Sequence, residues 1–125
     1  MKQPMFTDKA PKPIGPYNQA VKAGNFFFIS GQLAIDPKQG KIVADIITLQ
    51  TRQIMENIRA ILEAAGYSLN DLVQTTVYLS SLSTFDEFNA EYSKFFASDF
   101  PSRSTVGSEL KKGALVEISA IAYKE

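Results

Sequence analysis

The 125-residue chain contains no cysteine and no histidine, and these two absences exclude much of the chemistry found in active sites. Without them there is no thiolate nucleophile, no imidazole base, and no thiolate or imidazole ligand for a metal. A site of carboxylates alone could bind a hard cation, but the acidic residues do not cluster in the sequence. We therefore expect no metal site. The lack of cysteine also suits a cytoplasmic protein.

The sequence has no excess of charge, because its 13 basic residues match its 13 acidic ones. Nucleic acids and acidic membrane surfaces are bound by neutralising many phosphates, so we expect neither as a partner. No apolar run approaches the roughly 18 residues of a membrane span, and no segment resembles a signal peptide. The length and the hydrophobic content of 45% instead predict one soluble globular domain over residues 1–125.

The first half of the chain reads as an irregular arm, a strand and a helix. Residues 1–20 hold four of the six prolines and predict an extended arm. Residues 25–35 are aromatic and β-branched, which predicts a strand interrupted near Gly31, followed by a turn at 36–41. Apolar residues at spacings near 3.6 predict a helix over 45–65. Two pairs on its outer face should form exposed salt bridges, Arg52 with Glu56 and Arg59 with Glu63.

The second half reads as strand, helix and strand. Residues 71–82 predict a strand whose shared face carries Val73, Thr75, Val77 and Leu79. A second helix should begin at Thr84, which is spaced from Glu87 for a capping box. Its aromatic stripe is predicted to be core and consists of Phe85, Phe88, Tyr92, Phe95 and Phe96. Residues 113–124 predict the last strand. The order of elements indicates an α+β sheet with helices packed against it.

Two charged residues stand out because they lie in segments with a strand pattern. Arg103, in "FPSRSTV", has no local partner, and Glu117 is a carboxylate between apolar neighbours on its strand face. A buried or interfacial salt bridge between them is the structural interpretation. In the functional interpretation, Arg103 binds a substrate carboxylate with both arms of its guanidinium, and Glu117 handles a proton or a water molecule.

Three further residues are candidates for the same site, and each has a structural alternative. Tyr17 follows the rigid "IGP" and could be a packing aromatic. Ser30 could satisfy a bulge, and Gly31 could permit an unusual backbone angle.

Seven stretches occur in an order that resembles the RidA (YjgF) family of imine deaminases: "IGPYNQA", "FISGQLAIDPKQG", "QTRQIMENIRAILEAAG", "TTVYL", "FNAEYSKFF", "PSRSTV" and "GALVEISAIA". The resemblance implies a chorismate mutase-like fold, with a mixed β-sheet carrying two helices on one face. It implies homotrimers with three clefts between subunits. The implied activity is cofactor-independent hydrolysis of 2-imino acids, such as 2-iminobutanoate and 2-iminopropanoate, to 2-keto acids and ammonia.

The resemblance also assigns roles to individual residues. Arg103 would bind the substrate carboxylate, and Glu117 would lie near the attacking water. The other implied substrate-binding residues are Tyr17, Ser30, Gly31, Asn89 and Thr105. The sequence departs from the family pattern at four positions: Ser102 replaces a common alanine, Thr105 a common cysteine, Lys111 a frequent proline and Ser119 a common glutamate. These departures leave the substrate range open.

Other functions are compatible with the same residues. A non-catalytic trimer could use Arg103 to bind keto acids or similar small carboxylates. A chaperone-like role would use surface residues instead and would not need Arg103. RNA cleavage is the least favoured function, because the chain has zero net charge and no histidine.

Overall fold

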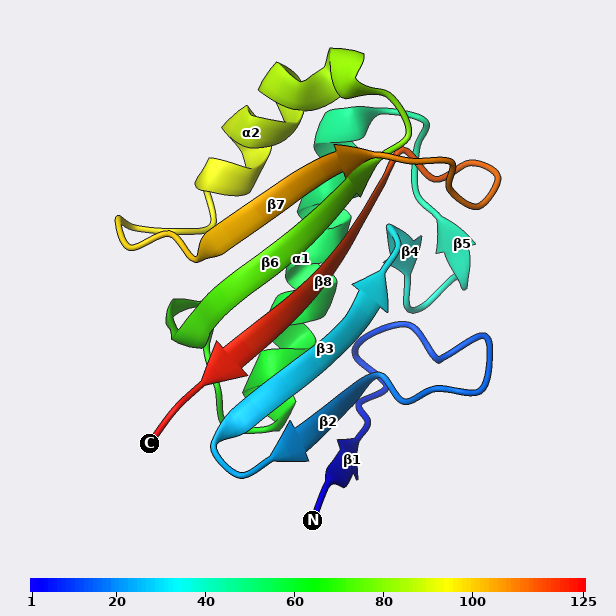
Figure 1. Ribbon diagram of the computed structural model, residues 1–125. Coiled ribbons are helices and arrows are strands. Elements are labelled where there is room, and N and C mark those ends of the chain that lie inside the picture. The colour runs from blue at the N-terminus through cyan, green and yellow to red at the C-terminus, as the bar shows by residue number, and fades with distance from the viewer.

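In a computed structural model that describes all residues 1–125, six strands form one sheet and two helices pack on one of its faces (Figure 1). Across the sheet the strands are β1 (Gln3–Met5), β2 (Ala20–Ala23), β3 (Phe26–Gln32), β8 (Val116–Tyr123), β6 (Leu72–Leu79) and β7 (Ser102–Gly107). All neighbours are antiparallel except β6 and β7, so the sheet is mixed. A separate hairpin joins β4 (Ile35–Asp36) to β5 (Lys41–Ile42).

The core lies between the sheet and the helices α1 (Ile47–Ala64) and α2 (Phe85–Ser93). Alternate residues of β8 face this core and are buried, namely Val116, Ile118, Ala120 and Ala122. The apolar stripe of α1 packs against them because its residues return to one face every three or four positions. The predicted α+β fold with two helices on one face is therefore confirmed. No helix has the length and apolar character needed to cross a membrane.

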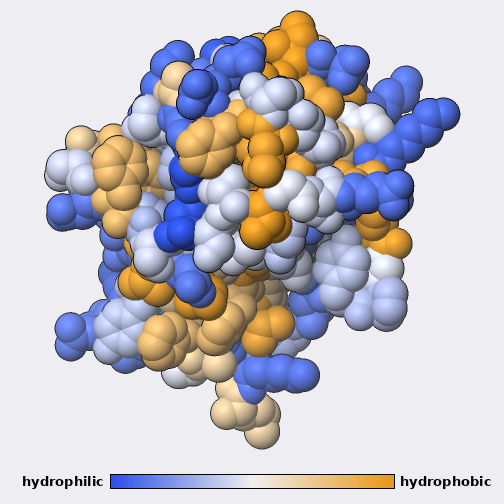
Figure 2. All heavy atoms as spheres, turned by 45° about the horizontal axis from the view of Figure 1, so that its top comes forward, coloured by the Kyte–Doolittle hydropathy of each residue, from blue (hydrophilic) through white to orange (hydrophobic).

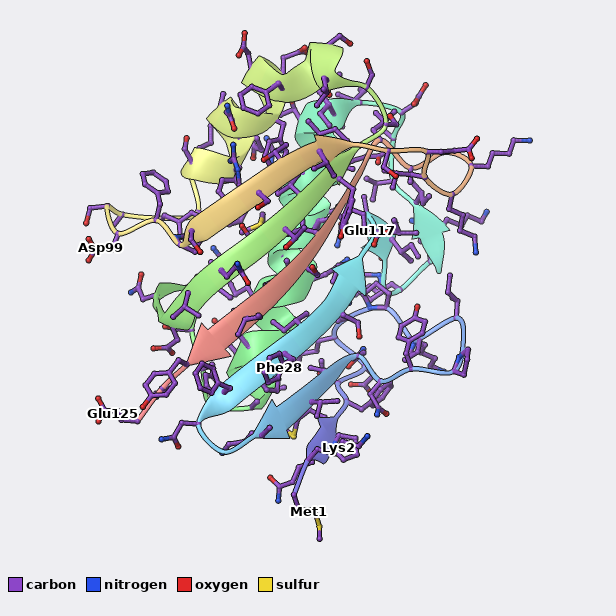
Figure 3. The ribbon with its side chains drawn as sticks, viewed as in Figure 1. Met1, Lys2, Phe28, Asp99, Glu117 and Glu125 are labelled. Atoms are coloured by element: carbon purple, nitrogen blue, oxygen red, sulfur yellow. The ribbon has the colours of Figure 1, made fainter.

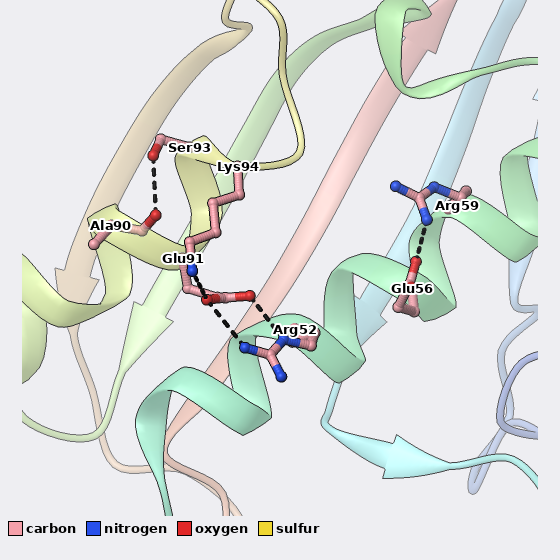
Figure 4. Close-up of polar contacts among 7 residues, drawn as sticks. All are labelled: Arg52, Glu56, Arg59, Ala90, Glu91, Ser93 and Lys94. Atoms are coloured by element: carbon pink, nitrogen blue, oxygen red, sulfur yellow. Dashed lines mark hydrogen bonds and ion pairs between the residues drawn. The ribbon is translucent and has the colours of Figure 1, made fainter.

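The predicted ion pairs along α1 are wrong, and Figure 4 shows the partners that the arginines have instead. Arg52 Nε donates to Glu91 Oε2 of α2 at 2.9 Å, and Lys94 Nζ donates to the other oxygen of Glu91 at 3.1 Å. Arg59 pairs with Glu56 rather than with Glu63. Arg52 reaches across to α2 because Glu91 is only 3% exposed and needs compensation there. The hydrogen bond from Arg52 lowers the pKa of Glu91.

Two further local predictions need correction. Val73 is exposed and does not share the buried face of Thr75, Val77 and Leu79, because β6 shifts its register against β8 between Leu72 and Gln74. Thr84 precedes α2 but makes no cap hydrogen bond, so the capping box is absent. Its hydroxyl instead donates to the carbonyl of Ser81 at 3.0 Å, within a 3₁₀ turn that leads into the helix.

The sheet face opposite the helices is not covered by any element of the chain (Figure 1). Phe28 and Glu117, labelled in Figure 3, lie on it. Phe26 packs against Tyr123 with ring centroids 4.9 Å apart, and both rings are exposed, as is Phe28. Figure 2 shows one side of the molecule, on which hydrophobic residues are exposed among hydrophilic residues. A sheet face that carries exposed aromatic rings is typical of a surface that binds another protein.

Candidate functional site

Arg103 lies on β7, at the edge of the sheet, and its side chain lies on the same side as the helices. It pairs in parallel register with Thr75, which is buried on the helix side of β6. Its Nη2 donates to Oδ1 of Asn89, on α2, at 2.7 Å. Two of the residues that the resemblance assigns to substrate binding are thus in direct contact.

Three aromatic rings of α2 surround the same guanidinium. Its central carbon lies 5.0 Å from the ring centroid of Tyr92, 5.3 Å from that of Phe88 and 5.7 Å from that of Phe85. The Tyr92 hydroxyl is hydrogen-bonded to Thr75 Oγ1 at 2.8 Å, which fixes the ring, and burial raises the pKa of this phenol. Neutral groups therefore hold Arg103, through cation–π contacts and one hydrogen bond.

Arg103 borders a hollow of about 350 Å³ and takes part in no ion pair. This space, the Arg103 hollow, is lined by Asn89, Tyr92, Ser93, Phe100, Pro101 and Arg103. A guanidinium has five donors in a fixed fork, and Asn89 occupies one of them. The remaining donors suit a carboxylate.

Glu117 lies on the opposite face of the sheet. It is paired in register with Tyr78 of β6, and its neighbours along β8 point into the core. It borders a space of about 420 Å³, the Glu117 cleft, which is lined by Ile14, Tyr17, Ser30, Gly31, Leu33, Lys111 and Glu117. Glu117 has no ion-pair partner, and burial raises the pKa of its carboxyl. Such a carboxyl can exchange a proton with a reacting group nearer to neutral pH than an ordinary one.

A β-bulge brings Ser30 and Gly31 to Glu117, because the register of β3 against β8 shifts between Ile29 and Gln32. Ser30 Oγ donates to the carbonyl of Asn18 at 2.6 Å, which ties the bulge to the N-terminal arm. Gly31 does not have a positive φ, so the backbone-angle interpretation is wrong. Its hydrogen side chain is needed because a Cβ there would collide with Glu117 Oε2.

The N-terminal arm places Tyr17 in the same cleft. Tyr17 is 45% exposed, which does not fit a packing role, and its hydroxyl accepts from the Ile14 N–H at 3.2 Å. Gln19 holds the arm and is 2% exposed. Its amide nitrogen donates to the carbonyls of Thr7, Ala10 and Pro11, while its oxygen accepts from the Thr7 N–H. Gln19 is not among the residues predicted from the sequence, although it lies in the "IGPYNQA" motif.

The candidate residues thus fall into two groups on opposite faces of the sheet. Arg103 and Asn89 form one group, while Tyr17, Ser30, Gly31 and Glu117 form the other. A buried salt bridge between Arg103 and Glu117 within one chain is wrong, since no such ion pair exists in the chain. A single chain also does not bring the two residues into one cleft.

Thr105 follows Arg103 by two residues on β7 and pairs with the buried Val77, so its side chain lies on the helix side. Its hydroxyl is buried without a hydrogen-bond partner in the chain, and it does not line the Arg103 hollow. The aromatic rings around Arg103 were predicted only as core. Phe88 and Tyr92 are indeed buried, but Phe85 is 37% exposed and lies over the guanidinium. Of the other two rings of the predicted stripe, Phe96 is buried and Phe95 is half-buried.

The chain is thus an α+β protein in which an arginine and a carboxyl, neither with an ion-pair partner, lie on opposite faces of one sheet. Residues 7–124 match the family described as Endoribonuclease L-PSP. The chain therefore belongs to this family, which is the RidA (YjgF) family that its motifs indicate.

Similar proteins cover the chain from end to end. A RutC family protein of Pyrococcus horikoshii is 58% identical, with all of both chains aligned. The 2-iminobutanoate/2-iminopropanoate deaminase of Escherichia coli is 42% identical, with 99% of each chain covered. Among solved structures, Escherichia coli TdcF with bound serine is 38% identical at a TM-score of 0.94, covering 98% of this chain and 99% of that one.

Proposed function

We propose that this protein is an imine deaminase, which hydrolyses 2-imino acids such as 2-iminobutanoate and 2-iminopropanoate to 2-keto acids and ammonia. The observation that carries the proposal is the combination of two unpaired groups. Arg103 is a cation held by neutral partners beside an open hollow, and Glu117 is a carboxyl whose pKa is raised by burial. The deaminase name of the 42% identical relative supports the same reaction.

In the proposed reaction, water adds to the C=N carbon of a protonated imine, and ammonia leaves as the C=O bond forms. Arg103 would bind the substrate carboxylate through its free donors and so fix the position of the imine carbon. Glu117 would accept a proton from the attacking water and return it to the departing nitrogen, and the proton of the new hydroxyl would pass to solvent as the C=O bond forms. The imine is already electrophilic, so orientation of the two reactants supplies much of the rate gain. These steps need no cofactor.

The proposed site is composite, because its two groups lie on opposite faces of one sheet. Arg103 of one copy and Glu117 of another would complete a cleft between subunits. The open sheet face with Phe26, Phe28 and Tyr123 offers an apolar surface for that association. We propose a homotrimer, in which closed symmetry repeats the same cleft three times.

The experiment that tests the proposal is hydrolysis of 2-iminobutanoate, generated in the assay by an amino-acid oxidase. We expect the protein to accelerate imine loss and release one ammonia for each 2-oxobutanoate. A folded protein that leaves the spontaneous rate unchanged would refute the deaminase function for this substrate.

A second candidate function is non-catalytic binding of keto acids or other small carboxylates. One observation favours this function. Asn89 and the aromatic rings hold Arg103 in place without Glu117, so Arg103 could bind a carboxylate without a catalytic partner. Serine bound to TdcF supports binding of a small α-carboxylate by a relative. Saturable 2-oxobutanoate binding without imine turnover would favour this function.

Substitution of Gly31 should impair the site without unfolding the protein. In Gly31→Ala the new Cβ displaces the Glu117 carboxylate, which is the mobile end of a half-buried side chain. We expect kcat to fall about tenfold or more with little change in Tm. Gly24→Ala is the matched control, because Gly24 has φ +61° and no atoms near the added Cβ. It should cost about 1 kcal/mol of stability and leave kcat unchanged. Loss of activity in both variants alike would contradict this role of Gly31.

A further inference from the structure

We propose that the substrates include 2-imino acids with a second, distal carboxylate, and that Lys111 binds that second carboxylate. This inference rests on the proposed deaminase function and narrows its substrate class. Lys111 lines the Glu117 cleft together with Tyr17 and Ser30. A dicarboxylic 2-imino acid of the 2-iminoglutarate type has the chemistry that such a cleft would recognise.

The backbone that carries Lys111 is fixed from inside the protein. Gln50 of α1 is fully buried, and its side-chain nitrogen donates to the carbonyl of Gly113 at 3.0 Å. Its oxygen accepts from the Leu115 N–H at 2.9 Å. The Lys111 carbonyl in turn accepts from the Ala114 N–H at 2.9 Å, which closes a turn. These hydrogen bonds fix the backbone of Lys111 at the edge of the cleft, while its side chain is exposed.

The charges of the cleft leave Lys111 without a counter-ion. No ion pair in the chain includes it, and Glu117 is the only acidic residue that lines the cleft. A smaller hollow beside it shares Ile14, Tyr17, Gly31 and Leu33 with the cleft and adds a second cation, Lys12. The region around Tyr17 thus holds two lysines and one carboxyl. With Arg103 of a second copy added, this balance favours a ligand with more negative charge than one carboxylate.

The geometry of the proposed reaction assigns the remaining substrate groups. The α-carboxylate would be bound by Arg103 of a second copy, and the C=N group would face Glu117. Lys111 is then the cation that remains for the distal end of the substrate, because it lines the same cleft as Glu117, whereas Lys12 lines only the neighbouring hollow. A lysine head on a flexible stem suits a terminal carboxylate, because it donates as a point charge without a demand for planar geometry.

The test compares kcat/KM for 2-iminoglutarate and 2-iminobutanoate, each generated in the assay by an oxidase, in wild type, Lys111→Ala and Lys112→Ala. In Lys111→Ala we expect the ratio of the two kcat/KM values to shift about tenfold against 2-iminoglutarate, mainly through its KM. Lys112→Ala removes the same charge one residue further along, where the side chain lines a different groove with Ile42 and Val43. Its ratio should equal that of wild type.

An equal loss for both substrates in Lys111→Ala would overturn the inference, since Lys111 would then act on a group that the two share. An unchanged ratio, or the same shift in both lysine variants, would also overturn it. If wild type hydrolyses neither imine, the deaminase function fails and calorimetry decides the inference separately. Tighter binding of 2-oxoglutarate than of 2-oxobutanoate, lost in Lys111→Ala only, would support it, and equal affinities would refute it.

Discussion

Replacing Arg103 by alanine is expected to lower kcat/KM for 2-iminobutanoate by about a hundredfold or more. The substitution removes the only cation that lines the Arg103 hollow, and with it the charge-assisted hydrogen bonds proposed for the substrate carboxylate. Steady-state kinetics on purified protein measure the effect. Arg103→Lys should recover only part of the loss, because lysine keeps the charge but lacks the planar fork.

The matched control for this variant is Arg59→Ala. Arg59 also lies over an aromatic ring, with its guanidinium carbon 5.3 Å from the Phe95 centroid, and it also contacts one polar side chain, Glu56. It lies on α1 and lines neither the Arg103 hollow nor the Glu117 cleft, so its loss should leave kcat/KM unchanged. Full activity in folded Arg103→Ala would contradict the role proposed for Arg103.

The second large effect is expected for Glu117→Gln, which should lower kcat by about a hundredfold or more while the protein stays folded. Glutamine keeps the size of the side chain and its hydrogen-bonding oxygen but cannot accept a proton. In wild type the rate should rise with pH as Glu117 ionises, and this limb should lie above the range of an ordinary carboxyl, because burial raises the pKa. The limb should be absent from the residual activity of Glu117→Gln.

Although kcat should fall in Glu117→Gln, the thermal stability of this variant should stay equal or rise. Because the folded pKa of Glu117 is raised, the folded state binds this proton more tightly than the unfolded chain does. The contribution of Glu117 to stability is therefore present below the ordinary carboxyl pKa and is lost as the pH rises through the raised value. Glu117→Gln should escape this loss and unfold at an equal or higher Tm than wild type at neutral pH. The exposed control Glu63→Gln should change neither Tm nor kcat, and a Glu117→Gln variant as active as wild type would refute the acid–base role.

The periodic parts of the fold could be predicted from the sequence because each side chain there has one dominant environment. Strand β8 alternates buried and half-buried residues as its sequence alternates, so both faces could be assigned in advance. The interruption of the strand near Gly31 could also be predicted, because a glycine within an aromatic strand marks a bulge or the close approach of another group to the backbone. Its cause was not readable, since the side chain that comes close belongs to Glu117, 86 positions further along the chain.

The failures come from partners that are distant in sequence. The helical spacing predicts an ion pair between Arg52 and Glu56, four residues away. Arg52 instead pairs with the buried carboxylate of Glu91. The sequence also does not predict that Arg103 and Glu117 lie on opposite faces of the sheet, because each residue alone fits a strand with one charged position. Only the parallel pairing of β7 with β6 and the antiparallel pairing of β8 with β6 place the two side chains on opposite faces.

The most direct test of the composite site is a mixture of two inactive subunits. Arg103→Ala retains Glu117, and Glu117→Gln retains Arg103, so neighbouring subunits of different type can together form a complete cleft. Refolding or coexpressing the two variants in equal amounts should restore about a quarter of the wild-type turnover, because random trimers contain one complete cleft in each mixed assembly. We expect this recovery, with neither variant active alone. A mixture that stays as inactive as its separate components, although mixed trimers form, would contradict the proposal that two copies build one site.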